Sequence, residues 1–157
     1  MKDGEKDCCP KFNPKKYDNK KVTWKGKYFV KDKVFSFFHI PLNFGSVVEK
    51  NMKKIKDANA MLKEPIILSD EKSMFGSNVY ISTKNALPKV HDVKLSGTFL
   101  TKVFEGPYKN MKKWIKQTEE YAKSQKKEVK NLYFHYPLCP KCSKKEGKNY
   151  VVIFAEI

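Results

Sequence analysis

Apolar residues along this chain recur at two spacings, one typical of strands and one typical of helices. Runs rich in β-branched and aromatic residues predict strands at 34–40, 65–69, 78–82, 93–104, 132–136 and 150–155. Helical spacing appears at Val48, Met52 and Ile55, and again from Tyr108 to Ala122. The predicted order is therefore strand, helix, strand, strand, followed by the same four elements again.

Both predicted helices have a recognisable start. Ser46 and Glu49 have the spacing of a capping box, which predicts a helix from Ser46 to about Asn59. Pro107 follows Gly106 and suits the first turn of the second helix. The whole pattern predicts an α+β fold with an antiparallel sheet and two helices.

The first 32 residues follow another pattern, in which isolated large apolar side chains stand among polar and turn-forming residues. These are Phe12, Tyr17, Trp24, Tyr28 and Phe29. We predict that 1–32 form an extended arm packed on the core, with a flexible tail as the alternative. A chain of 157 residues suits one domain. We expect that domain to span 33–157, in two halves of about 33–92 and 93–157.

The net charge of +16 raises the question of a nucleic-acid partner. All 33 basic residues are Lys, however, and base reading relies heavily on the Arg fork. The Lys residues are also scattered, which favours a solvated surface over a nucleic-acid site. No run approaches the roughly 20 apolar residues of a membrane span, and the N-terminus lacks the apolar core of a secretory signal. We therefore expect no membrane contact and a cytoplasmic protein.

Four cysteines carry the clearest metal signal. Cys139 and Cys142 have the Cys-x-x-Cys spacing with which two thiolates bind one zinc ion. Cys8 and Cys9 would complete a structural tetrathiolate site, although adjacent cysteines chelate one ion awkwardly. A redox pair and unpaired thiols are the alternatives. No other cofactor is expected.

Four motifs together resemble the GyrI-like small-molecule-binding family, and in particular a stand-alone subgroup labelled as hydrolases. They are Cys-Cys-Pro at 8–10, Phe-Phe-His-Ile-Pro-Leu-Asn-Phe-Gly at 37–45, the run from Leu95 to Tyr108 that ends in Glu-Gly-Pro-Tyr, and the stretch 139–152. The resemblance implies two βαββ halves related by a pseudo-twofold axis, with the helices flanking a ligand groove. Relatives often carry a Glu on a strand before an aromatic residue and Pro. The corresponding stretches here lack it, which leaves Glu105 and Glu156 as acidic candidates.

Flat aromatic rings bind flat ligands with large contact area and attract cations through their faces. The residues expected to contact the ligand are Tyr80, Phe104, Tyr108, Trp114, Tyr136 and Asn43. The catalytic candidates are Glu105, His39 and Tyr108, with Glu105 or His39 as the acid or base. For each ring, ordinary core packing is the alternative.

Three functions remain open on the sequence. The first is a binding protein whose groove captures a lipophilic or aromatic compound, as a detoxification or sensing role would need. The second is a hydrolase of electrophilic small molecules in the same groove. The third is a basic factor that binds proteins or nucleic acid. The chain has no glycine-rich phosphate loop and no Gly-x-Ser-x-Gly elbow, which argues against a nucleotide-dependent enzyme or a serine hydrolase. A homo-oligomer is compatible with all three.

Overall fold

A computed structural model describes residues 12–37, 40–41, 43–70, 76–87, 92–137 and 147–157. The strands are β1 (Lys20–Phe37), β2 (Ile40–Pro41), β3 (Ile67–Asp70), β4 (Gly76–Ser82), β5 (Asp92–Glu105), β6 (Asn131–His135) and β7 (Tyr150–Glu156). The helices are α1 (Phe44–Asp57) and α2 (Met111–Ser124), with short 3-10 turns η1 (Pro14–Lys16) and η2 (Tyr108–Asn110). The predicted α+β class is confirmed.

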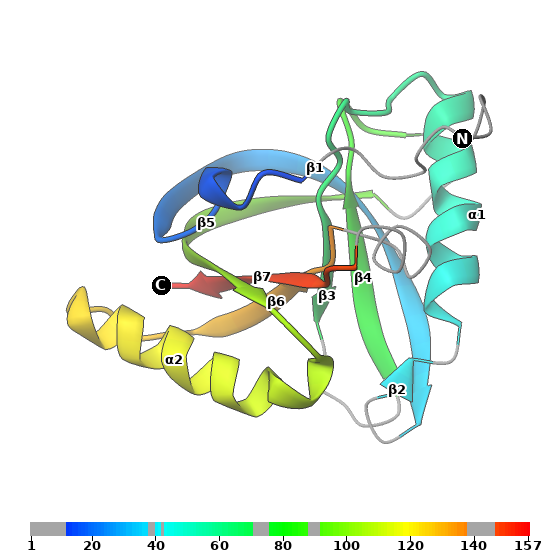
Figure 1. The fold of residues 1–157 in the computed structure, drawn as a ribbon. Coiled ribbons are helices and arrows are strands. Elements are labelled where there is room, and N and C mark those ends of the chain that lie inside the picture. The colour runs from blue at the N-terminus through cyan, green and yellow to red at the C-terminus, as the bar shows by residue number, and fades with distance from the viewer. Residues whose placement is uncertain (1–11, 38–39, 42, 71–75, 88–91, 138–146) are drawn as a thin grey trace.

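Six strands form an antiparallel sheet that closes into a barrel, in the order β1-β4-β3-β6-β7-β5 and back to β1. Figure 1 shows the strands curving around a common core, with α1 and α2 against different sides. Closure depends on the length of β1. Its first half pairs with β5 and its second half pairs with β4. The sequence predicted the antiparallel sheet but not its closure.

Residues 20–32, assigned to the arm on the sequence, are the first part of β1. Lys20 to Val30 pair with β5 through a ladder that is interrupted by a bulge between Trp24 and Lys27. Gly26 there has a φ of +61°, a conformation that other residues rarely adopt. The proposed boundary at 32/33 falls inside this strand. The many Lys residues obscure the strand pattern because the outer face of this part of β1 meets solvent.

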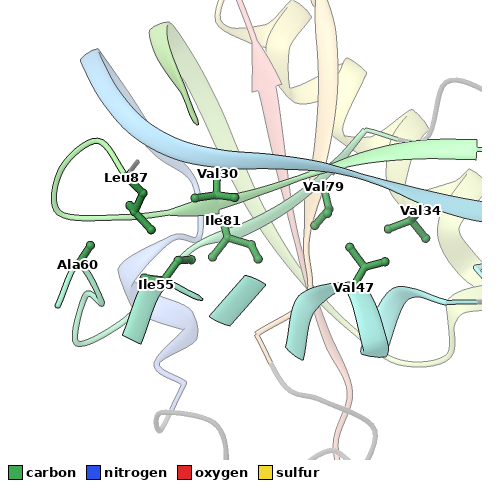
Figure 2. Close-up of a cluster of buried hydrophobic side chains, with 8 residues drawn as sticks. All are labelled: Val30, Val34, Val47, Ile55, Ala60, Val79, Ile81 and Leu87. Carbon is green, nitrogen blue, oxygen red and sulfur yellow. The ribbon is translucent and has the colours of Figure 1, made fainter. Parts of the chain in front are cut away.

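Helix α1 covers the side of the barrel formed by β1 and β4. Val47 and Ile55 pack on Val30, Val34 and neighbouring aliphatic residues, as Figure 2 shows. The buried face is centred on Val47, Asn51 and Ile55 rather than on Val48 and Met52, which are only partly buried.

The predicted start of α1 at a Ser46 capping box is wrong, because the helix begins at Phe44 and Ser46 lies within its first turn. The Ser46 hydroxyl instead donates to the carbonyl oxygen of Asn43 at 3.1 Å. The side chain of Asn43 accepts a hydrogen bond from the backbone N–H of Phe35 at 2.7 Å. This bond ties the helix start to β1.

Helix α2 covers β5 and β7, and buries Trp114, Thr118 and Ala122. Pro107 precedes η2, so the regular helix begins at Met111, later than the sequence predicted.

The barrel interior is a third apolar cluster, separate from those beneath the two helices. Its buried members are Trp24, Phe29, Leu68, Tyr80, Phe99, Val152 and Phe154.

Candidate active site at the barrel mouth

Polar side chains gather at one end of the barrel interior, which we call the mouth. They stand on four strands, at positions that alternate with outward-facing residues. The mouth residues are Asp70 on β3, Tyr80 on β4, Asn131 and Tyr133 on β6, and Glu156 on β7. Asp70 and Tyr80 are buried, whereas Asn131, Tyr133 and Glu156 are half-buried, so this is a partly shielded group of carboxylates, phenols and an amide.

Glu156 is held in place by its neighbours on both adjoining strands. It is the ladder partner of Asn131 on β6 and of Phe99 on β5. The Asn131 amide Nδ2 donates to Oε2 of Glu156 at 2.8 Å. A methyl group placed on Gly97 would lie 3.5 Å from the other oxygen, Oε1, and 3.4 Å from the Phe99 ring. Gly97 therefore leaves room beside Oε1.

Three aromatic rings form the wall of the mouth. The centroids of Tyr80 and Tyr133 lie 6.1 Å apart with an interplanar angle of 84°. Phe99 meets Tyr133 edge to face, also at 6.1 Å. The ammonium group of Lys31 lies 5.7 Å from the centroid of Tyr80. Phe99 is also the ladder partner of Glu156, so ring surface lies next to this carboxylate.

The phenols of the mouth resist ionisation. Burial is the main cause that raises the pKa of Tyr133 to about 12, and the charges of Glu156 and Asp70 add to it. Burial and Asp70 also raise the pKa of Tyr80. Both phenols stay protonated near neutral pH and can donate hydrogen bonds. A carboxylate beside protonated phenols can take a proton from water while the phenols stabilise a developing anion.

A groove of about 690 Å³ lies beside the mouth, between α2 and the segment that leads into β6. Its lining includes Ile115, Leu132 and Phe134, together with Asp70 and Asn131 of the mouth. The groove and the mouth are therefore adjacent parts of one region.

The residues predicted for the ligand groove separate into several places. Tyr80 lies in the mouth. Phe104 and Trp114 stack on each other at 5.5 Å in the apolar cluster beneath α2.

Tyr108 is 51% exposed, and its ring meets that of Tyr136 at 5.5 Å. Tyr136 in turn meets Phe44 at the start of α1, at 6.1 Å. Asn43 bonds the backbone of β1, as described above. Tyr108, Tyr136 and Phe44 form a second aromatic group, separate from the mouth.

Glu105 is exposed at the end of β5, opposite Tyr150 in the ladder. The second predicted acid or base, His39, lies outside the described residues. So do the four cysteines of the predicted zinc site, Cys8, Cys9, Cys139 and Cys142. Within the described part of the chain, no group of three or more His, Cys, Asp or Glu side chains could hold a metal ion. Neither of the two described α-helices is long and apolar enough to cross a membrane.

Sequence reasoning missed Asp70, Asn131 and Tyr133, and named Glu156 only as a remaining acidic candidate. Alternation along β6 is the signal that could have found two of them. Asn131, Tyr133 and His135 share one face of that strand, and Leu132 and Phe134 share the other. The polar face was not recognisable as an interior face until the barrel was known to close.

A search of curated proteins finds no match to this chain. A family model described as "Bacterial hydrolase" matches residues 1–157. The match covers every strand that contributes to the mouth, and this chain belongs to the bacterial hydrolase family.

Proposed function

We propose that this protein binds an electrophilic small molecule at the barrel mouth and hydrolyses it, with Glu156 as general base and Tyr133 as hydrogen-bond donor. The observation that carries the proposal is the fixed orientation of Glu156. Asn131 holds Oε2 at 2.8 Å, and Oε1 lies beside the space above Gly97. The family description agrees with hydrolysis and does not specify the substrate.

The proposed reaction is the addition of water to an ester carbonyl or a strained ring such as an epoxide. Glu156 takes a proton from water as the water oxygen forms a bond to the electrophilic carbon. The carbon–oxygen bond to the leaving oxygen breaks, and Tyr133 donates a hydrogen bond to that oxygen as it gains charge. Glu156 then returns its proton, so that water is the only reagent consumed.

Capture without hydrolysis is the second candidate, and the aromatic wall of the mouth favours it. Tyr80, Tyr133 and Phe99 supply contact area that serves binding whether or not water is activated. The two candidates differ only in the role of Glu156. A detoxifying or sensing protein needs the contacts, whereas a hydrolase needs the base as well.

The finer resemblance to the GyrI-like subgroup stays a proposal, and the strand pairing supports it. Strand β1 pairs with β4 and β4 with β3, while β5 pairs with β7 and β7 with β6. The remaining pairings join strands that hold the same place in the two halves, β1 with β5 and β3 with β6. Two βαββ halves related by a pseudo-twofold axis would have this pattern.

Several expectations from the sequence also remain proposals. They are a structural zinc ion on the four cysteines, a cytoplasmic location, the absence of a nucleic-acid role, and self-association. The candidate group of Glu105, His39 and Tyr108 is the competing site for catalysis. A matched pair of variants distinguishes this candidate site from the one at the barrel mouth.

The test is Glu156→Gln compared with Glu105→Gln, using panels of activated esters and epoxides as substrates. The Gln side chain can still accept the Asn131 hydrogen bond but cannot take a proton from water. We expect Glu156→Gln to lower kcat at least about 100-fold, while the Kd for an unreactive amide analogue changes little. Glu105→Gln should be close to the wild type.

The reverse result, in which Glu105→Gln is inactive and Glu156→Gln is not, would move catalysis to the competing site. Binding of the analogue without turnover of any substrate would support capture alone.

A further inference from the structure

The groove beside α2 has an apolar floor and a rim of mixed charge. Ile115, Leu132 and Phe134 form the floor. The rim carries three ammonium groups, from Lys123, Lys127 and Lys130, and two carboxylates, from Glu119 and Glu128. Opposite charges in similar number give little net attraction for a charged ligand, so the groove suits a neutral, apolar one.

The groove adjoins the mouth where β3 meets β6, the strand pair of the barrel with the fewest ladder pairs among the described residues. Only two residue pairs join β3 and β6 among the described residues, Leu68 with His135 and Ser69 with Phe134. Beyond the second pair no further ladder pair joins β3 to β6 among the described residues; Asp70 on β3 pairs with β4 instead, and Asn131 on β6 pairs with β7. Both of these residues line the groove, and Asn131 holds the proposed base. A ligand in the groove would therefore reach Asn131, whose amide nitrogen lies 2.8 Å from Glu156.

We propose that the groove binds an apolar arm of the substrate whose electrophilic end reacts at Glu156. The substrate class is then an elongated, neutral compound with its reactive centre at one end, and not a small polar metabolite. A volume of about 690 Å³ lies within the range of small-molecule sites and far exceeds what a short acyl group fills. This inference rests on the function proposed above.

A series of para-nitrophenyl esters from acetate to decanoate tests the arm. Because each added methylene would be buried on the groove floor, kcat/KM should rise steadily with chain length, mainly through a lower KM. Replacing Ile115 by Thr exchanges an ethyl group of the floor for a hydroxyl and should lower kcat/KM for the decanoate by at least about four-fold, the factor that corresponds to one buried methylene. The same variant should lower kcat/KM for the acetate much less, so that the ratio of decanoate to acetate turnover falls.

Val48→Thr is the matched control. Val48 is also a partly buried, β-branched residue on a covering helix, but it packs in the cluster beneath α1 and does not line the groove. It should not alter the ratio of decanoate to acetate turnover. An equal kcat/KM for both esters in the wild type, or an equal effect of Ile115→Thr on both, would overturn the proposal.

Binding of unreactive amides separates failure of the groove from failure of the proposed reaction. Decanamide should bind more tightly than acetamide by calorimetry, and Ile115→Thr should weaken only decanamide. If this holds while no ester or epoxide is hydrolysed, the groove is an apolar binding site and the proposed hydrolysis is wrong. If both amides bind equally while esters are hydrolysed, the groove inference alone is wrong.

Discussion

At the scale of single residues, Tyr133 shows how strongly position alters a common side chain. Its phenol stands on β6 between the charge of Glu156 and that of Asp70, in a barrel interior that excludes part of the surrounding water. Both influences oppose a second negative charge, and they raise its pKa to about 12. The same environment that keeps the phenol protonated makes it a donor for an anion that forms briefly during a reaction.

Replacing Tyr133 by Phe should lower the hydrolysis rate about 100-fold, because one donor to the developing anion is lost. Tyr108→Phe is the control, since that ring is half exposed and lies outside the mouth. The check is kcat with the best ester of the panel. Equal rates for wild type and Tyr133→Phe would remove this residue from the mechanism.

The same phenol should make the fold sensitive to alkali. The folded pKa of about 12 lies above the ordinary value of 10, so the unfolded chain releases this proton first. The stability that Tyr133 contributes is present below pH 10 and is lost as the pH rises toward 12. Denaturant titrations of wild type and Tyr133→Phe should therefore converge over this window. A constant difference in the free energy of unfolding would contradict the raised pKa.

At the scale of elements, η1 and its flanking residues close the end of the barrel opposite the mouth. The Tyr17 ring meets Phe154 at 5.9 Å and His135 at 6.2 Å, both edge to face. The hydroxyl of the buried Thr101 donates to the carbonyl oxygen of Tyr17. Asp18 accepts the backbone N–H of Val103 at 3.2 Å. A short turn and its flanking residues are thus fixed to three strands and cover this end of the interior.

Removing the Tyr17 ring by replacement with Ala should cost about 2 kcal/mol of unfolding free energy, somewhat less than for a fully buried ring because Tyr17 is only partly buried. Tyr108→Ala is again the matched control and should cost much less. Urea denaturation followed by tryptophan fluorescence measures both. Equal losses of unfolding free energy for the two variants would show that the Tyr17 ring does not stabilise this end of the barrel.

At the scale of the whole molecule, closure of the barrel buries His135, which an open sheet would expose to solvent. His135 lies inside, with Nδ1 at 3.1 Å from the carbonyl oxygen of Ile67 and 3.2 Å from its nitrogen. Burial lowers its pKa to about 4, and the backbone contact to Ile67 opposes this only in part. The folded protein therefore holds His135 neutral over a range in which the unfolded chain protonates it.

This difference makes the fold sensitive to mild acid. The contribution of His135 is complete above pH 6.5 and is lost as the pH falls toward 4, by up to about 3 kcal/mol. His135→Leu should flatten the dependence of Tm on pH in this window relative to wild type. Parallel curves for the two proteins would mean that His135 is not buried as a neutral ring.

Local patterns along the chain determined the α+β class, the approximate positions of the two helices and of five barrel strands, and the C-terminal end of β1. Periodicity and breakers such as Gly106 and Pro107 act between near neighbours, so they are readable without a fold. They were less precise at the helix starts, since α1 begins at Phe44 and not at the Ser46 capping box.

Tertiary structure alone decided the closure of the sheet and the residues that meet at the mouth. Asp70, Asn131, Tyr133 and Glu156 belong to three strands, and only strand register places them together. Register depends on pairing between residues far apart in sequence, which no local pattern contains. The sequence by itself therefore identified Tyr80 and the acidic candidates, while closure of the barrel decided which of them could form one site.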